Sequence, residues 1–441
     1  MEKKRELIIL VGICLISLFF GLWKISDRYE FGWDQEDDAK KVMGMIEEKK
    51  PLLIGPRVSS EDGFFVGPYH YYYLLPFYGL NKGNPKSGIM AVTVINLATV
   101  ISLYWVCRKL YGQKTAIGAS LLMILAQKEI GWSAMYLGLV GVWGWWGVNK
   151  LLQSRKNIVW VLAFWGLASN LHLAPVSMGV PILAGFWLSN DKKFDKKELV
   201  RAMVGFLVFF LPLVVFEIRH DFLNIRKIVG MVWGEKITER ENWLAVKVFW
   251  KSLSIFGLKW GREAEVWGER GMVLLGALRG IFLLKNKKEK IMASLWLINP
   301  LIAMMIYKGG VSEYYYSIAG VVIIILLARN LALMKGWGWL IVGIMIINGG
   351  ANLMEEKSEI SLKNKMELAG YLTSQKQDKV FNLSYELPLG LDNGFGYLFK
   401  YLGKTPKNVD EGHLYTIMLD RDEAKTGETV ARSGALILKR R

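Results

Sequence analysis

Three carboxylates fall within five positions of the segment FGWDQEDDA, residues 31–39. They belong to Asp34, Asp37 and Asp38, and the segment follows the first hydrophobic run of the chain. Neighbouring carboxylates raise one another's pKa, which moves one of them toward the range that suits a general base. Acids at a membrane face repel one another and are costly near lipid, so a purely structural role explains the cluster poorly. The sequence therefore predicts chemistry at a membrane surface.

An irregular segment with many aromatic residues follows these acids. Residues 38–50 carry apolar side chains on one helical face, which predicts a short amphipathic helix at the interface. Two Gly-Pro pairs then stiffen the chain, at Gly55-Pro56 and Gly67-Pro68. The run from Tyr69 to Tyr73, which includes His70, Tyr71 and Tyr72, comes next. Such a run is common in an aromatic belt at the bilayer edge, and it could also form a platform for a sugar ring.

The composition places these segments in a membrane protein. The chain has 441 residues, of which 52% are hydrophobic, and a mean hydropathy of +0.25. Its apolar residues gather in runs about as long as a bilayer is thick. The first run lacks a small-residue cleavage site, so we expect a retained anchor and not a signal peptide. Cys14 and Cys107 both lie in apolar runs and indicate neither a disulfide framework nor a metal site. We expect eleven spans, at residues 7–25, 88–107, 115–127, 132–149, 158–170, 173–189, 200–218, 269–284, 291–307, 314–328 and 336–353.

The distribution of basic residues predicts the orientation of these spans. The net charge of +17 is concentrated in short loops that follow the even-numbered spans, which favours cytoplasmic loops over nucleic-acid binding. The N-terminus would then be cytoplasmic in a multi-pass plasma-membrane protein. The long loops 26–87 and 219–268 and the tail would lie outside. We expect a transmembrane domain at 1–353 and a small soluble α/β domain at 354–441, with a helix at 360–375 and strands at 379–383, 413–419 and 435–439.

The second long loop is basic although its predicted position is external. Trp243, Val246, Phe249 and Trp250 recur at helical spacing, which is typical of an amphipathic helix at the interface. The same positive charge could form a site for an anionic lipid substrate. The two interpretations are compatible.

The order of these motifs resembles a known family. Asp34-Gln35, Asp38-Ala39, the two Gly-Pro pairs and Tyr71-Tyr72 are similar to elements of the C-type glycosyltransferases, in particular those related to protein O-mannosyltransferases and to the lipid A aminoarabinose transferase. Two later elements also match, at residues 170–173 and 216–222. The resemblance covers residues 7–230 well and the remainder only by layout.

The resemblance implies transfer of a sugar from a polyprenyl-phosphate carrier to an acceptor hydroxyl on the extracytoplasmic face. It assigns Asp34 as the catalytic base, and Asp38 is the next candidate. Gln35 stands where many relatives have Glu, which weakens a metal or paired-carboxylate role, so a divalent metal stays open. Asp37 stands where an Arg is expected, which indicates changed contacts to acceptor or phosphate.

A departing phosphate also requires cations. The outer-face candidates are Arg57, His70, Arg219 and His220. For each Arg the alternative is contact with a phospholipid headgroup. Two further predicted substrate-site residues lie at span ends. We expect Glu217 to pair with Arg219 or a site cation, and His172 to form a hydrogen bond between helices more readily than to bind a ligand.

Two other functions compete with sugar transfer. A lipid or glycan flippase would also be polytopic, but it should carry charges in mid-membrane and a repeat, and neither is visible. A glycan polymerase or ligase usually places its chemistry in a large late outer loop, whereas the acids here lie in the first. The sequence does not identify the sugar or the acceptor, which could be a protein, a lipid or a glycan.

Overall fold

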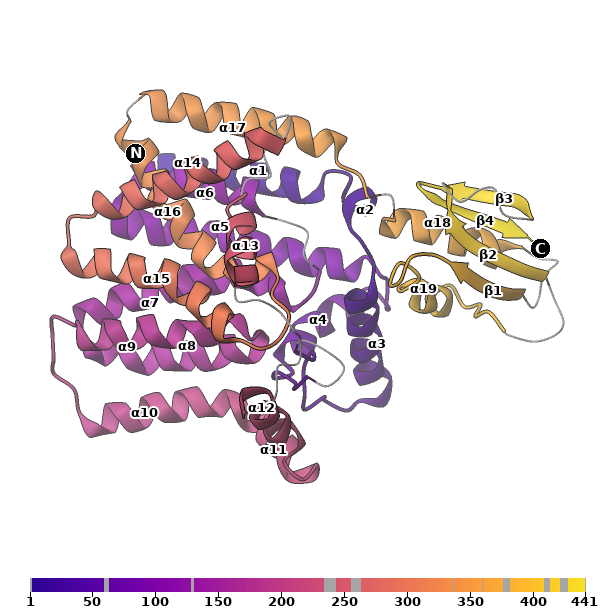
Figure 1. The fold of residues 1–441 in the computed structure, drawn as a ribbon, viewed down its shortest axis with the longest axis horizontal. Coiled ribbons are helices and arrows are strands. Elements are labelled where there is room, and N and C mark those ends of the chain that lie inside the picture. Colours follow the sequence, from indigo (N-terminus) through magenta and orange to yellow (C-terminus); the bar gives the residue numbers. More distant parts are fainter. Residues whose placement is uncertain are drawn as a thin grey trace.

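The computed structural model describes residues 2–58, 63–127, 131–233, 243–254, 263–334, 336–358, 360–375, 381–407, 413–420 and 427–440. Figure 1 shows a large helical part and, at its side, a small domain with a sheet. Helix α3 lies between the two parts. This arrangement confirms the predicted class, an α-helical membrane fold with a C-terminal α/β domain.

All eleven hydrophobic runs form mainly helix. The helices that contain them are α1 (Glu2–Leu22), α5 (Ser87–Tyr111), α6 (Gln113–Ala126), α7 (Leu137–Gln153), α8 (Ile158–Leu171), α9 (Gly179–Trp187), α10 (Lys196–Leu207), α11 (Leu211–Arg219), α14 (Glu263–Phe282), α15 (Lys287–Ile306), α16 (Ser317–Leu333) and α17 (Gly336–Glu355). Six of the described helical segments are long and apolar enough to cross a membrane. The number of eleven spans and their orientation stay predictions. The turn predicted at Lys128-Glu129 lies outside the described residues.

Helix α16 is the centre of the helical part. It packs against α6, α7, α14 and α17, and most of its side chains are buried. Small residues allow the close packing, since Gly141 of α7 meets the Val321 side chain and the Ile318 carbonyl. Trp145 of α7 and Trp296 of α15 pack edge to face at 5.8 Å nearby. These helices form the packed core of the helical part.

The first long loop contains two helices, α3 (Trp33–Glu48) and α4 (Tyr69–Leu80), which pack against each other. The sequence predicts a helix only from residue 38, and this boundary is wrong. The Gln35 side chain accepts a hydrogen bond from the Gly32 backbone N–H at 2.9 Å, which caps the helix end and starts it at Trp33. All three aspartates therefore lie on a helix. The aromatic run belongs to α4 and not to an irregular loop.

The second long loop also contains two helices, α12 (Leu223–Trp233) and α13 (Trp243–Ser252). Helix α13 confirms the predicted amphipathic helix. Helix α12 packs on the first loop, because the Asn224 side chain exchanges two hydrogen bonds with the Phe65 backbone, at 2.6 and 2.9 Å. Four basic residues of the predicted cationic loop lie outside the described residues: Lys236, Arg240, Lys259 and Arg262.

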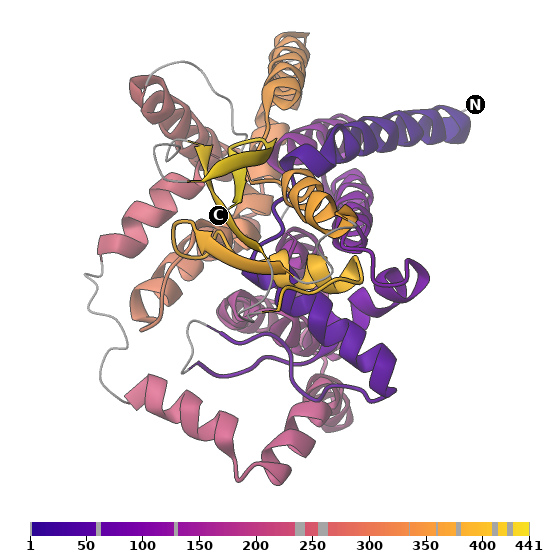
Figure 2. The same cartoon turned by 90° about the vertical axis from the view of Figure 1, so that its right-hand side faces the viewer.

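The C-terminal domain consists of α18 (Leu362–Ser374), α19 (Phe395–Tyr401) and a four-stranded sheet of order β1-β2-β4-β3. The strands are β1 (Phe381–Glu386), β2 (His413–Leu419), β3 (Glu428–Ser433) and β4 (Leu436–Arg440). Strands β1 and β2 are parallel, and the other pairs are antiparallel. The prediction misses β3, an edge strand with few apolar residues, and α19, which is only seven residues long. Figure 2 shows the sheet in front of the helical part.

Candidate active site

A cavity of about 940 Å³ lies beside the first turns of α3. Five segments of the chain form its wall: the start of α3, the loop that leads into α4, the chain before α7, the end of α8 and the chain before α16. The residues of this wall that matter below are Trp33, Asp34, Asp37, Asp38, Arg57, Tyr71, Trp132, His172, Tyr314 and Tyr315. The structure thus brings together six of the twelve residues that the sequence predicts for the site.

The three aspartates share one face of α3, because residues three and four positions apart lie above one another on a helix. Asp34 opens into the cavity, and no hydrogen bond or ion pair links it to another described residue. Its surroundings raise its pKa to about 6, first through burial in the cavity and then through the charges of Asp38 and Asp37. The charge of His70 acts in the opposite direction. Asp34 is thus a free carboxylate with a pKa near neutrality.

Asp38 is held in place by His70, a residue that does not line the cavity. Its Oδ2 lies 2.7 Å from Nε2 of His70, and Nδ1 of His70 lies 3.0 Å from the Tyr136 hydroxyl. A neutral His70 would donate from Nε2–H to Asp38 and accept from Tyr136. His70 is completely buried and does not line the cavity, so its contact is with Asp38 and not with a ligand in the cavity.

Two cations approach the aspartates from the cavity wall. Lys41 Nζ lies 3.9 Å from Asp37 Oδ1, one helical turn away. Arg57 is exposed in the loop before α4, and its guanidinium lies 4.9 Å from the centre of the Phe65 ring. The positive charges of Lys41 and Arg57 both act to lower the pKa of Asp37, although burial raises it overall. The cavity therefore holds carboxylates and cations side by side.

The two Gly-Pro pairs build the loop that presents Arg57. Backbone hydrogen bonds join Gly55 N to Val66 O at 2.7 Å and Val58 N to Phe64 O at 2.8 Å. A Cβ on Gly55 would lie 2.0 Å from the Gly67 carbonyl oxygen, and one on Gly67 would lie 2.4 Å from Oδ1 of Asn170. Only glycine fits at these two contacts. Residues 55–58 and 64–67 of this loop are therefore closely paired, and Gly67 presses against Asn170 near the end of α8.

The aromatic residues that could form a platform for a sugar ring have two different roles in the structure. Tyr71 is buried, lines the cavity and has a pKa raised by burial and then by the charge of Asp38, so its hydroxyl stays protonated. Tyr72 donates a hydrogen bond from its hydroxyl to the Leu52 carbonyl at 2.5 Å. Tyr69 donates to the Phe209 carbonyl at 3.0 Å. Only Tyr71 of this run lines the cavity, while Tyr69 and Tyr72 hold neighbouring segments.

His172 lines the opposite wall of the cavity. Its Nδ1 accepts a hydrogen bond from the Ala174 N–H at 3.1 Å, a contact within one connection and not between helices. Its ring packs against Tyr314 and Tyr315. Burial, and to a smaller extent the charge of His70, lowers the pKa of His172 to about 3, so the ring is neutral at pH 7.

The three predicted residues at the end of α11 lie off the cavity wall. Glu217 is buried and accepts a hydrogen bond from the Ile225 N–H at 3.1 Å, which replaces the pairing with Arg219 that the sequence suggested. Arg219 is exposed. His220 stacks on Phe216 at 4.1 Å and bonds to the Phe216 carbonyl. Among the residues that the structure describes, Arg57 is the predicted phosphate ligand that borders the cavity.

The acids and histidines of the described chain do not form a metal centre. No group of three or more His, Cys, Asp or Glu side chains within the described ranges has a geometry that could hold a metal ion. Gln35 caps α3 and is absent from the cavity wall. The described donor set thus does not fit a divalent metal.

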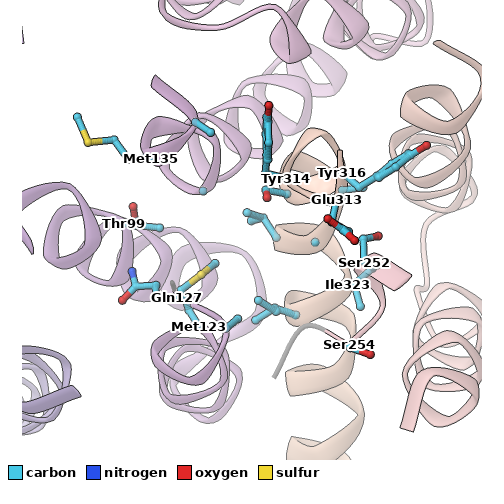
Figure 3. Close-up of a pocket in the computed structure, with 18 of the residues that line it drawn as sticks. Thr99, Met123, Gln127, Met135, Ser252, Ser254, Glu313, Tyr314, Tyr316 and Ile323 are labelled. Carbon is cyan, nitrogen blue, oxygen red and sulfur yellow. The ribbon is translucent and has the colours of Figure 1, made fainter. Parts of the chain in front are cut away.

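A second cavity, of about 570 Å³, shares Trp132 and Tyr314 with the first. Figure 3 shows Thr99, Met123, Gln127 and Met135 on one side, and Ser252, Ser254 and Glu313 on the other. Lys251 and Arg270 also line it, and Arg270 donates from Nε to the Ser254 hydroxyl at 2.8 Å. This cavity has a cationic end and an apolar side.

Sequence reasoning missed several residues of the first cavity. Trp33 directly precedes Asp34, so a Trp beside an acid cluster was an available signal in the sequence. Trp132, Tyr314 and Tyr315 are more than 90 positions from the acids along the chain, and no local pattern points to them.

Solved structures with a similar fold were found by comparison. ArnT from Cupriavidus metallidurans in the apo state matches with a TM-score of 0.63 at 12% identity, over 100% of this chain and 98% of that one. The same protein bound to undecaprenyl phosphate matches with a TM-score of 0.60 at 11% identity, over 98% and 97%. The Archaeoglobus fulgidus oligosaccharyltransferase, in complex with zinc and sulfate, gives 0.55 at 13% identity, over 93% of this chain and 68% of that one.

No family model and no curated protein sequence matches the chain. The structural likeness extends over nearly the whole chain at low identity, so it shows a shared fold. The fold expected from the sequence, that of the C-type glycosyltransferases, is confirmed.

Proposed function

We propose that this protein is a membrane glycosyltransferase that moves a sugar from a polyprenyl-phosphate carrier to an acceptor hydroxyl, with Asp34 as the general base. The observation that carries the proposal is the free Asp34 carboxylate, with a pKa raised to about 6, in a cavity that Arg57 also lines. The fold supports the proposal, since ArnT with the same fold was solved with undecaprenyl phosphate bound.

The reaction is a displacement at the anomeric carbon. The acceptor oxygen forms a bond to this carbon while the bond to the phosphate oxygen breaks, and polyprenyl phosphate leaves with the electron pair. Asp34 takes the proton of the acceptor hydroxyl. Its negative charge also favours the cationic character that develops on the sugar ring.

Other groups of the cavity would raise the pKa of Asp34, stabilise the departing phosphate or bind the sugar hydroxyls. Asp38, held by His70, keeps a second negative charge next to Asp34 and so raises the pKa of the base. Arg57 would stabilise the departing phosphate through charge-assisted hydrogen bonds. The neutral His172 and the protonated Tyr71 can donate or accept hydrogen bonds to sugar hydroxyls.

The second cavity offers a place for the carrier. Lys251 and Arg270 supply positive charge, while Met123, Met135 and Ile323 supply an apolar wall. A lipid with a phosphate at one end needs both kinds of surface. Because the two cavities share Trp132 and Tyr314, a carrier there would hold its sugar next to the aspartates.

The proposed function is tested by comparing surface glycans and glycoproteins, by mass spectrometry, from cells with and without the gene. A sugar present only with the gene, and lost again with Asp34→Asn, supports the proposal. A flippase would change the location of a lipid-linked sugar without forming a new glycosidic bond. Such a result would contradict the proposal.

The raised pKa of Asp34 predicts the acid side of the pH profile. A general base acts only when it is deprotonated, so kcat/KM should rise with pH and reach half of its plateau near pH 6. An unperturbed aspartate would place this midpoint about two pH units lower. Initial rates between pH 4.5 and 8 measure it, with buffer pairs that overlap to exclude buffer effects. A midpoint near 4 would contradict the environment that we assign to Asp34.

The predicted orientation can be measured with single cysteines. With Cys14 and Cys107 replaced by serine, Lys357→Cys should react with an impermeant thiol reagent in intact cells. Lys193→Cys should react only after permeabilisation. Both positions are exposed in the folded protein, so the side of the membrane on which they lie, and not burial, determines whether they react. The reverse pattern would place α3, its cavity and the C-terminal domain on the cytoplasmic side.

A further inference from the structure

The C-terminal domain contacts the same helix that carries the aspartates. Glu36, which lies between Asp34 and Asp38 in the sequence, is buried and does not line the cavity. Its carboxylate accepts hydrogen bonds from the Gly394 N–H at 2.6 Å and from the Tyr397 N–H at 2.7 Å. A single turn of α3 therefore presents aspartates to the cavity and Glu36 to the C-terminal domain.

A buried lysine completes this contact from the other side. Lys365 of α18 is 1% exposed, and its Nζ donates to the Phe31 carbonyl at 3.1 Å and to the Asn393 carbonyl at 2.5 Å. Phe31 lies two residues before α3 begins. Lys365 thus links the chain that enters α3 to residue 393, next to the segment 394–397 that contacts Glu36.

Glu36 and Lys365 carry opposite charges in a largely buried interface. Glu36 also forms an ion pair with Lys40 of the same helix, at 2.9 Å between Oε1 and Nζ. A buried charge is costly without an opposite charge nearby, so removal of Glu36 takes a compensating charge from Lys365. Burial lowers the pKa of Lys365 to about 8, and among the nearby charges that of Glu36 acts most strongly against this shift. The two groups therefore stabilise the docked arrangement together.

Two glycines let the segment approach α3 closely. A Cβ on Gly394, whose φ is +98°, would lie 2.2 Å from the Phe31 carbonyl oxygen. A Cβ on Gly396 would lie 2.7 Å from Oε1 of Glu36. A larger residue at Gly394 would clash with the Phe31 backbone, and one at Gly396 would displace the Glu36 carboxylate, so glycine at these positions permits the contact.

We propose that the C-terminal domain is a positioning part of the site, which holds the first turns of α3 through Glu36 and Lys365 so that the three aspartates face the cavity. The positioning role rests on the function proposed above, but the contact itself can be measured without it. Glu36 and Lys365 are positioning residues, because they act on the cavity only through α3.

The test compares Glu36→Gln, Lys365→Met and Gly396→Ala in the full-length protein in lipid nanodiscs. Gly396→Ala retains both charges and removes only the space beside Glu36, so it tests the contact if a charge variant folds poorly. The matched control is Lys400→Met, since Lys400 pairs with Glu47 at 3.6 Å across the same α19–α3 contact but at the exposed surface.

The first readout is hydrogen–deuterium exchange of the backbone over residues 33–39. Loss of the buried contacts should speed this exchange by roughly 10- to 100-fold, whereas the control should match the wild type. The second readout is the acid side of the pH–rate profile. A looser α3 reduces the burial that raises the pKa of Asp34, so the midpoint should move toward lower pH. Simple loss of folded protein would lower the rate without moving the midpoint.

Each outcome decides the proposal. Faster exchange in α3 together with a shifted midpoint, absent from the control, supports it. Unchanged hydrogen–deuterium exchange in all three variants overturns it. Faster exchange in α3 also overturns it if the rate of sugar transfer and the pH midpoint stay those of the wild type. If the wild type transfers no sugar, the function proposed above fails, and exchange in α3 alone then decides whether the C-terminal domain orders this helix.

Discussion

Replacement of Asp34 by asparagine should leave a folded, membrane-inserted protein that transfers sugar about 100-fold more slowly or not at all. The change is nearly isosteric. Asp34 makes no hydrogen bond or ion pair with a described residue, so its loss should cost little stability. The carboxylate is the proton acceptor in the proposed reaction, and the amide cannot take its place. Transfer from a labelled polyprenyl-phosphate sugar, normalised to folded protein, measures the effect.

A carboxylate elsewhere on the same helix provides the control. Glu48 lies at the end of α3, is exposed and is absent from the cavity wall. Glu48→Gln removes one negative charge from α3 as Asp34→Asn does, and it should keep wild-type turnover. Near-normal turnover of Asp34→Asn would reject its assignment as the base and make Asp38 the next candidate.

Arg57→Ala should weaken binding of the polyprenyl-phosphate sugar by about 1.5–3 kcal/mol, which corresponds to roughly 10- to 150-fold in Kd. Arg57 lies in the loop between Gly55 and Gly67 and lines the cavity together with the aspartates. Arg57→Lys should restore only part of the affinity, because lysine lacks the planar pair of donors. Titration of the donor into detergent-solubilised protein measures the three affinities.

Arg219 is the matched control for this prediction. The sequence groups it with Arg57 as a phosphate ligand, but the structure leaves it exposed and off the cavity wall. Arg219→Ala should therefore change donor affinity much less than Arg57→Ala. Equal losses at both positions would indicate diffuse attraction of an anionic lipid and would reject a phosphate site at Arg57.

The sequence was sufficient for features that depend on local composition. Apolar runs predict helices because a helix satisfies its own backbone hydrogen bonds in a lipid environment, and all eleven runs form mainly helix. The strand His413–Leu419 was predicted with its observed bounds, since its apolar side chains are continuous. The acid cluster was recognised for a similar reason, because charges so close together have few structural uses beside a membrane.

The local signal failed where a side chain acts on a distant partner. The sequence cannot show whether Glu36, Gln35 or His70 faces the cavity, since all three are polar and near the aspartates. Gln35 caps α3, Glu36 binds the C-terminal domain and His70 holds Asp38. Each of these roles depends on which backbone or side chain lies opposite, and the partner of Glu36 is up to 361 positions away.

The sequence by itself therefore determined the membrane-protein class, the helical layout, the C-terminal α/β domain and Asp34 as the candidate base. Only the tertiary structure decided which of the charged residues share a cavity. Helix periodicity places Asp34, Asp37 and Asp38 on one face, but it cannot tell which face the rest of the chain covers. Packing of α3 against α19 covers Glu36, and packing against α4 places His70 on Asp38, while Asp34 stays open to the cavity. Burial in the cavity is the largest cause of the raised pKa of Asp34, about 6, and the charges of Asp38 and Asp37 on the same helix add to it.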